Sequence, residues 1–155
     1  MNEEQFAISK DGFIHLPVLY REVIEYLMVS GPCRIIDGTL GSGGHSSLIL
    51  KANPQAELLG IDRDGDALER AQENLNFAGK RVHLARGNFS ELANLANEIG
   101  WDSVDAVLLD VGVSSPQIDD SKRGFALRLD GPLDMRMDKR SQLTASRILN
   151  YRGET

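Results

Sequence analysis

Cysteine is almost absent from this chain of 155 residues, which carries Cys33 alone. One thiol excludes an internal disulfide and a multi-cysteine metal site, so the sequence suits a reducing compartment and predicts a cytoplasmic protein. Long apolar runs are missing too, because no stretch approaches the roughly 20 residues that span a bilayer. The acidic residues at 1–5 do not resemble a signal or transit peptide. We therefore expect no membrane partner and no targeting segment.

Positive charge is scarce over most of the chain. Residues 1–120 carry 9 Lys or Arg against 19 Asp or Glu, and the whole chain has a net charge of −6. Residues 121–140 reverse this balance with 6 basic and 3 acidic side chains. A local basic segment on an acidic protein is expected where one edge meets phosphate groups. A solvated loop of mixed charge explains the composition equally well.

Glycine is concentrated in one turn. Between Ile35 and His45 a β-type apolar segment passes into a helical one through four glycines in seven residues, at positions 38, 41, 43 and 44. Glycine allows positive φ and a close approach of the backbone to a ligand, and the following helix directs free N–H groups to the same place. The turn predicts a nucleotide-like cofactor site. The alternative is a turn that only packs tightly.

Two acids indicate which cofactor this turn would hold. Asp37 opens it, and Asp62 ends a second apolar run 25 positions later. The order Asp-Gly-x-x-Gly-x-Gly-Gly differs from the G-x-G-x-x-G of dinucleotide sites, and an acid repels pyrophosphate. A carboxylate suits the cationic amino and sulfonium groups of S-adenosylmethionine, and one at the end of the second strand can bind ribose hydroxyls. A nicotinamide-dependent oxidoreductase is therefore the weaker alternative.

Strand-like and helix-like patterns alternate along the chain, which predicts a parallel sheet with its ligand at the carboxyl ends of the strands. A first amphipathic helix carries Leu16, Leu19, Val23, Tyr26 and Leu27, with His15 and Pro17 at its start. The predicted strands are 34–37, 57–62, 81–86 and 104–110, and the predicted helices are 44–52, 66–77, 89–99 and a last one beginning in 143–151.

The ends of the predicted strands carry Asp37, Asp62, Asn88 with Phe89, and Asp110. Asp110 directly follows a continuous apolar run, where a carboxylate is costly unless it is hydrogen-bonded or functional, and we favour function. Phe89 could face an adenine ring, or it could be the first core residue of a helix. Residues 111–138 lack a sustained period but are rich in Phe, Leu and Met, which is typical of a functional loop rather than a disordered one.

Six sequence blocks, and the order in which they occur, resemble those of a known protein family. They are His15-x-Pro17-Val18-Leu19, Asp37-Gly38-Thr39-x-Gly41-x-Gly43-Gly44-His45, Asp62-Arg63-Asp64, the run Leu108 to Gln117, Arg123-Gly124-Phe125, and Asp130-Gly131-Pro132-Leu133-Asp134-Met135-Arg136-Met137-Asp138. This pattern resembles the bacterial 16S ribosomal RNA cytosine-N4 methyltransferases, the family also called ribosomal RNA small subunit methyltransferase H. The last block is especially specific.

The resemblance implies an α/β fold of the Rossmann-like, class I S-adenosylmethionine-dependent methyltransferase type. It implies a methyl donor held by Gly43, Gly44, His45, Asp62, Phe89, Asp110 and Gln117, in addition to Asp37 from the glycine turn, and no metal. The substrate it implies is the N4 amino group of a cytidine in the decoding region of 16S ribosomal RNA, not DNA. Asp110 is the candidate catalytic residue, and Arg123, Arg128 and Arg136 are the candidates for binding RNA phosphates.

Members of this family are longer, with a helical domain inserted after the Met-Arg-Met-Asp block. We therefore expect 1–138 to form an incomplete methyltransferase domain and 139–155 to begin the inserted domain. The strand at 104–110 reads as a buried central strand, and without its later neighbours it would leave an apolar edge open to homodimer formation or other self-association. The alternative to an active enzyme is then a catalytically inactive fragment that binds S-adenosylmethionine.

Overall fold

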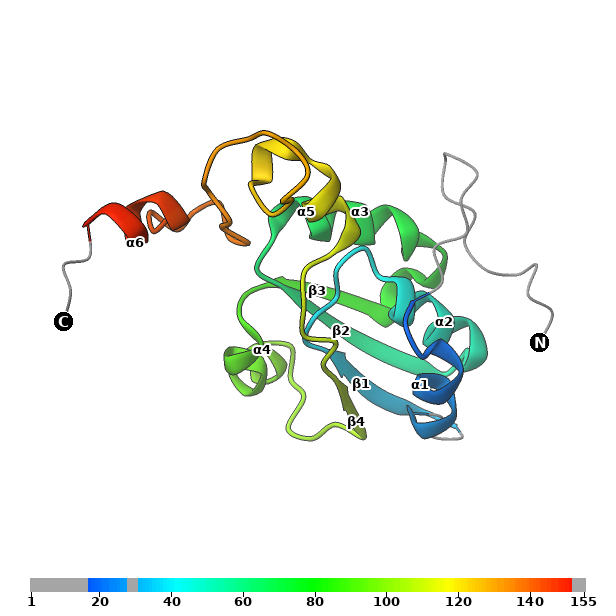
Figure 1. Cartoon of the computed structure of the whole chain (residues 1–155). Coiled ribbons are helices and arrows are strands. Elements are labelled where there is room, and N and C mark those ends of the chain that lie inside the picture. Colours follow the sequence, from blue (N-terminus) through cyan, green and yellow to red (C-terminus); the bar gives the residue numbers. More distant parts are fainter. Residues whose placement is uncertain (1–16, 28–30, 152–155) are drawn as a thin grey trace.

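Four parallel strands form the centre of the computed structural model, which describes residues 17–27 and 31–151 (Figure 1). The strand order is β3-β2-β1-β4. The strands are β1 Cys33–Asp37, β2 Ala56–Asp62, β3 Val82–Arg86 and β4 Ala106–Leu108. All four predicted strands are present, and their parallel pairing confirms the expected α/β fold.

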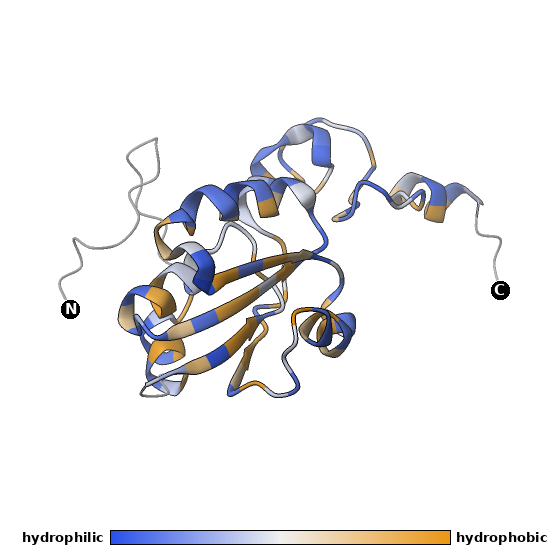
Figure 2. Cartoon of the chain, turned by 180° about the vertical axis from the view of Figure 1, so that it is seen from behind, coloured by the Kyte–Doolittle hydropathy of each residue, from blue (hydrophilic) through white to orange (hydrophobic). Residues whose placement is uncertain are grey.

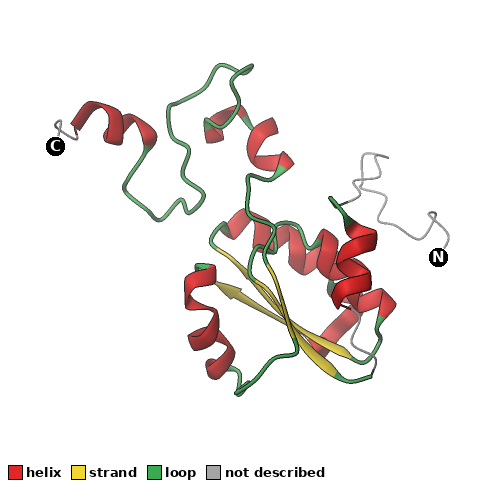
Figure 3. Ribbon diagram, turned by 60° about the horizontal axis from the view of Figure 1, so that its bottom comes forward, coloured by secondary structure: helices red, strands yellow, loops and turns green. Residues whose placement is uncertain are grey.

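Helices cover both faces of this sheet. The helices α1 (Tyr20–Leu27), α2 (Gly44–Ala52) and α3 (Gly65–Asn74) lie on one face, and α4 (Leu92–Glu98) lies on the other (Figures 1 and 3). The 3-10 turns η2 (Asn76–Arg81) and η3 (Phe89–Glu91) flank β3. His15 and Leu16, expected at the start of the first helix, lie outside the described residues.

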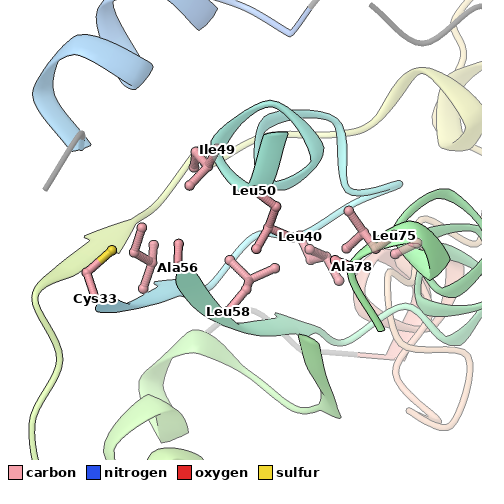
Figure 4. Packing of buried hydrophobic residues seen from close by; sticks show 10 residues of the cluster. Cys33, Leu40, Ile49, Leu50, Ala56, Leu58, Leu75 and Ala78 are labelled. Carbon is pink, nitrogen blue, oxygen red and sulfur yellow. The ribbon is translucent and has the colours of Figure 1, made fainter. Parts of the chain in front are cut away.

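The core divides along the strands because successive side chains point to opposite faces. On the face of α2 and α3, Leu58 packs with Leu50 and Leu75 (Figure 4). Ile35 belongs to the same cluster. On the face of α4, Ile36, Leu59 and Ile61 pack with Ala96 and Trp101. Burial on both faces explains why the middle of β1 and of β2 is apolar, and in Figure 2 these strands are largely orange, with blue segments.

β4 is shorter and more exposed than the sequence predicted. It pairs with β1 alone, and its other edge has no strand partner among the residues that the structure describes. The side chains of Val107 and Leu109 are 42% and 45% exposed, so the reading of 104–110 as a buried central strand is wrong for this chain. Within the described residues, β4 therefore has the open apolar edge that the sequence predicted.

The segment after β4 holds more regular structure than its sequence suggested. It contains α5 (Ser115–Asp119) and the 3-10 turn η4 (Ser121–Arg123) before an irregular stretch leads to α6 (Ala145–Tyr151). α6 extends away from the sheet and has no buried residue (Figures 1 and 3). The domain boundary at 138/139 stays a prediction. In the described part of the chain, every helix is too short or too polar to cross a membrane.

Candidate cofactor site

A pocket of about 480 Å³ opens at the carboxyl ends of β1, β2 and β4, and this volume lies in the usual range for small-ligand sites. The glycine turn forms one wall, and the segment after β4 forms another. Six of the residues predicted to hold a cofactor line this pocket, namely Gly44, His45, Asp62, Phe89, Asp110 and Gln117. Asp37 and Gly43 do not line it.

The glycine turn is shaped by close packing as well as by the pocket. Gly43 has a φ of 79° and precedes α2, and a Cβ there would lie 3.1 Å from Leu75. A Cβ on Gly38 would lie 2.6 Å from Leu109, so this residue keeps the turn against the segment after β4. The turn is therefore tightly packed, and this packing brings its backbone to the pocket wall, while its contact with a cofactor stays a prediction.

Asp37 lies behind the turn and is only 2% exposed. Its Oδ1 accepts a hydrogen bond from the backbone N–H of Thr39 at 3.1 Å, and its Oδ2 accepts one from the Ser46 hydroxyl at 2.7 Å. Burial raises the pKa of Asp37, and these two hydrogen bonds offset part of that effect. The carboxylate thus fastens the turn to α2, and this position argues against the expected contact with a cationic group of the cofactor.

Asp62 combines a structural role with a place in the pocket. Its Oδ2 accepts the backbone N–H of Gly41 at 2.8 Å, and its Oδ1 accepts that of Asp64 at 2.9 Å. A carboxylate has about four lone-pair sites, so both oxygens can accept further hydrogen bonds from hydroxyl groups. The side chain is partly exposed and lines the pocket, which is consistent with the predicted hydrogen bonds to ribose hydroxyls.

His45 connects the N-terminal segment to the opposite side of the pocket. Its Nε2 lies 2.8 Å from the carbonyl oxygen of Val18. Because a carbonyl only accepts, Nε2 carries the hydrogen, and Nδ1 faces Asp110 with 3.9 Å between Nδ1 and Oδ2. Asp110 is 49% exposed at this position, and its backbone N–H donates to the Thr39 hydroxyl. An exposed carboxylate on the pocket wall does not need a partner inside the core.

Phe89 contributes an apolar surface to the pocket, and Gln117 contributes a polar one. Phe89 begins η3 and presents a partly exposed aromatic ring to the pocket. Gln117 is buried, with Oε1 accepting from the Ser114 N–H at 3.1 Å and Nε2 donating to Asp64 Oδ2 at 2.9 Å. The Ser114 hydroxyl, buried on the same wall, has no hydrogen-bond partner in the part of the chain that the structure describes. A polar ligand would satisfy this oxygen.

The three arginines predicted to bind RNA lie in different environments. Arg123 is buried, and its Nη2 lies 2.8 Å from Asp64 Oδ2, which argues against the expected phosphate contact. Arg136 forms a two-pronged pair with Asp134 and is 26% exposed, and this pairing lowers the pKa of Asp134. Arg128 is 75% exposed and pairs with Asp119, which is 63% exposed. Only Arg128 presents most of its side chain to solvent.

Several lining residues were not predicted to be cofactor or substrate contacts. They are Pro17, Thr39, Ser42, Arg63 and Met137. All five lie inside or beside the sequence blocks quoted above, so the blocks were the available signal. Asp64 was also missed, although its block placed it two residues after Asp62.

The site fits a nucleoside with a cationic tail. Carboxylates lie at Asp62 and Asp110, and the ring of Phe89 supplies an apolar wall. The Ser114 hydroxyl, which has no hydrogen-bond partner among the described residues, is available to a polar group. In the described residues no group of three His, Cys, Asp or Glu side chains is placed to hold a metal ion.

The fold is that of the class I S-adenosylmethionine-dependent methyltransferases. Similar solved structures include the C-terminal domain of precorrin-6Y C5,15-methyltransferase from Rhodobacter capsulatus, at a TM-score of 0.52 and 22% identity over 74% of this chain and 58% of that one. NSun6 from Pyrococcus horikoshii gives a TM-score of 0.53 and 24% identity over 66% of this chain and 26% of that one.

Residues 12–155 match the model of the MraW methylase family, and the chain belongs to this family. It is 46% identical to ribosomal RNA small subunit methyltransferase H of Cutibacterium acnes over 93% of this chain and 43% of the relative. The enzyme of the same name from Desulfovibrio desulfuricans is 50% identical over 82% of this chain and 39% of its own length. The resemblance seen in the sequence is confirmed. The chain spans less than half the length of the curated relatives that it matches.

Proposed function

We propose that this pocket binds S-adenosylmethionine and that the chain serves methyl transfer to the N4 amino group of a cytidine in the decoding region of 16S ribosomal RNA. One observation supports this most directly. Six of the eight predicted cofactor residues, from four separate segments, line one pocket at the carboxyl ends of a parallel sheet in a member of a methylase family.

The residues of the chain act mainly by positioning. When bound, S-adenosylmethionine supplies an electrophilic methyl group on a sulfonium. Asp62 would accept hydrogen bonds from ribose hydroxyls, and Phe89 would pack against the adenine. Asp110, exposed on the pocket wall, would accept a hydrogen bond from the N4 amino group, whose lone pair is otherwise delocalised into the ring. Holding the two reactants in line is the larger contribution.

The target base has to leave its stack to reach such a pocket. Arg128, and to a smaller extent Arg136, are the proposed phosphate contacts on the basic segment, whereas Arg123 is removed from this group because its charge is paired inside the protein. A ribosomal substrate would place the protein in the cytoplasm and leaves no role for DNA.

A second candidate is a chain that binds the cofactor but does not turn over. The observation in its favour is the open edge of β4, where Val107 and Leu109 are half-exposed. Such an edge also supports self-association through a second copy of this chain. In this case cofactor binding persists and methyl transfer does not.

Two measurements test the proposal. Calorimetry with S-adenosylhomocysteine and with NAD should give binding for the first only. Labelled methyl transfer to small-subunit particles, followed by mass spectrometry of the nucleosides, should then give N4-methylcytidine. Binding without transfer supports the second candidate. Affinity for NAD with no response to S-adenosylhomocysteine contradicts both.

A further inference from the structure

A buried charge cluster joins the start of α3 to the segment after β4. Asp64 is 1% exposed, and its Oδ2 accepts from Gln117 Nε2 at 2.9 Å and lies 2.8 Å from Arg123 Nη2. Its Oδ1 accepts the N–H of Asp66 and so caps α3. Burial raises the pKa of Asp64, but the hydrogen bonds from Gln117 and Arg123 outweigh it and leave this pKa lowered. Asp64 is therefore a carboxylate at neutral pH.

Arg123 extends the cluster to a third part of the chain. Its Nη2 donates to the carbonyl oxygens of Arg136 at 3.0 Å and Met137 at 3.2 Å, and its Nη1 lies 3.4 Å from Asp66 Oδ2. Its own carbonyl accepts the N–H of Met135 at 3.0 Å. One guanidinium, which η4 supplies, thus contacts both the start of α3 and the main chain at 136–137.

The main chain of the loop that follows Arg123 is closely packed. A Cβ on Gly124 would lie 2.2 Å from the carbonyl oxygen of Pro132, and one on Gly131 would lie 2.1 Å from that of Ser121. The loop from Ser121 to Asp134 is therefore closed by main-chain contact on both sides of Arg123. Such crowding excludes a side chain at Gly124 and Gly131 and keeps the main chain beside Arg123 closely packed.

The cluster touches the pocket only through two of its partners. Gln117 and Met137 line the pocket, whereas Asp64 and Arg123 do not. Neither hydrophobic cluster on the two faces of the sheet includes a residue after Leu108. A buried ion pair is weak evidence for stability, because desolvation of the two charges offsets most of their attraction. Its geometry here points to placement of the pocket wall instead.

We propose that Arg123 is a positioning residue of the cofactor pocket, which acts with Asp64 to hold Gln117 and Met137 against the bound methyl donor. This inference rests on the proposed function of the pocket. It assigns Arg123 a role inside the protein, in place of the phosphate contact that its sequence position suggested.

Calorimetric titration of the chain with S-adenosylhomocysteine tests this role. Arg123→Gln should weaken binding by about tenfold to a hundredfold, as expected when supporting residues are lost. Arg123→Lys should fall between this variant and the wild type, because an ammonium cannot reach two carboxylates and two carbonyls in the same geometry. Lys122→Gln, which removes the exposed charge next to Arg123, is the matched control and should bind as the wild type does.

Hydrogen exchange separates positioning from general stability. In Arg123→Lys we expect faster exchange at 114–119 and 134–138 and unchanged protection in β1 and β2. Affinity of both Arg123 variants within about twofold of the wild type would overturn the inference. Equal loss of protection in the sheet would overturn it as well, since Arg123 would then be a structural residue. Failure of the wild type itself to bind would instead contradict the proposed function.

Discussion

The Nε2 atom of His45 donates a hydrogen bond of 2.8 Å to the carbonyl oxygen of Val18, and this bond holds the segment before α1 against the pocket. The same imidazole is 10% exposed and presents Nδ1 to Asp110. His45, which the resemblance implies to be a cofactor contact, therefore also closes one end of the pocket.

Replacement of His45 tests this closing role. His45→Leu removes the donor to Val18 and should lower the free energy of unfolding by about 0.5 to 1.5 kcal/mol, the usual net value of one hydrogen bond. His45→Gln keeps an N–H donor and should lose less. Denaturant unfolding gives the stability, and calorimetry with S-adenosylhomocysteine should show weaker binding in the same order. Equal behaviour of the two variants would contradict this interpretation.

Removal of the Asp62 carboxylate should weaken the cofactor complex. Asp62→Ala deletes an acceptor for ribose hydroxyls and the acceptor for the Gly41 N–H, so we expect a loss of about 1 to 3 kcal/mol in binding free energy. Glu69→Ala, an exposed acid on α3, is the control and should bind normally. Unchanged affinity in Asp62→Ala would show that ribose is recognised elsewhere.

Asp110 should matter more for turnover than for folding. Its side chain is 49% exposed, so Asp110→Ala should leave the melting temperature nearly unchanged. The rate of methyl transfer to small-subunit particles should fall, because the activation free energy rises by about 2 to 4 kcal/mol. Transfer is measured in whichever form of the protein is active, this chain or a longer one. A fall in stability as large as the fall in rate would make Asp110 a structural acid.

Gly43 and Gly100 form a matched pair, because both have a φ close to 78°. An alanine at either position takes a left-handed conformation that costs about 1 to 2 kcal/mol. Gly43→Ala also brings a Cβ to 3.1 Å from Leu75, whereas nothing lies within 4 Å of a Cβ at Gly100. We expect the larger loss of stability, and a loss of cofactor binding, only in Gly43→Ala. Thermal unfolding and calorimetry of both variants decide this.

The charge cluster at Asp64 should make stability depend on pH in the acid range. Because its folded-state pKa is lowered, the ion pair stabilises the protein above the unfolded pKa, and this contribution is lost as pH falls through the folded pKa. Asp64→Asn leaves the buried Arg123 charge without this carboxylate, so the variant should be less stable than the wild type at about pH 7, by up to about 3 to 5 kcal/mol. The difference should shrink toward about pH 3, where the wild-type carboxylate also begins to lose its charge. A constant difference between the two melting temperatures across this range would show that the carboxylate charge is not involved.

The parallel sheet and the position of the pocket could be predicted because local sequence patterns indicate both. Apolar runs that end in Asp37 and Asp62 mark strand ends, and a glycine turn between a strand and a helix marks the crevice. What could not be predicted is which way a polar side chain turns. The Asp37 side chain lies behind the glycine turn and accepts a hydrogen bond from Ser46. The Arg123 side chain points into the protein and pairs with Asp64, which is 59 positions away in the sequence. Charge composition does not distinguish a buried arginine from an exposed one.

The short extent of β4 has a similar cause. A run of apolar residues predicts burial on both faces, but burial requires neighbours, and β4 has one strand partner in the described residues. The half-exposed side chains of Val107 and Leu109 therefore depend on packing that periodicity alone does not reveal.

The two crowded glycines of the loop between Ser121 and Asp134 affect how this part of the sequence can vary. Main-chain oxygens occupy the space of a side chain at Gly124 and Gly131, while Leu127 between them is fully exposed. In a randomised library selected for folding and cofactor binding, only glycine should survive at 124 and 131, and most residue types should be recovered at 127. Sequence drift in this loop would then be confined to its tip, between two positions that main-chain packing holds constant.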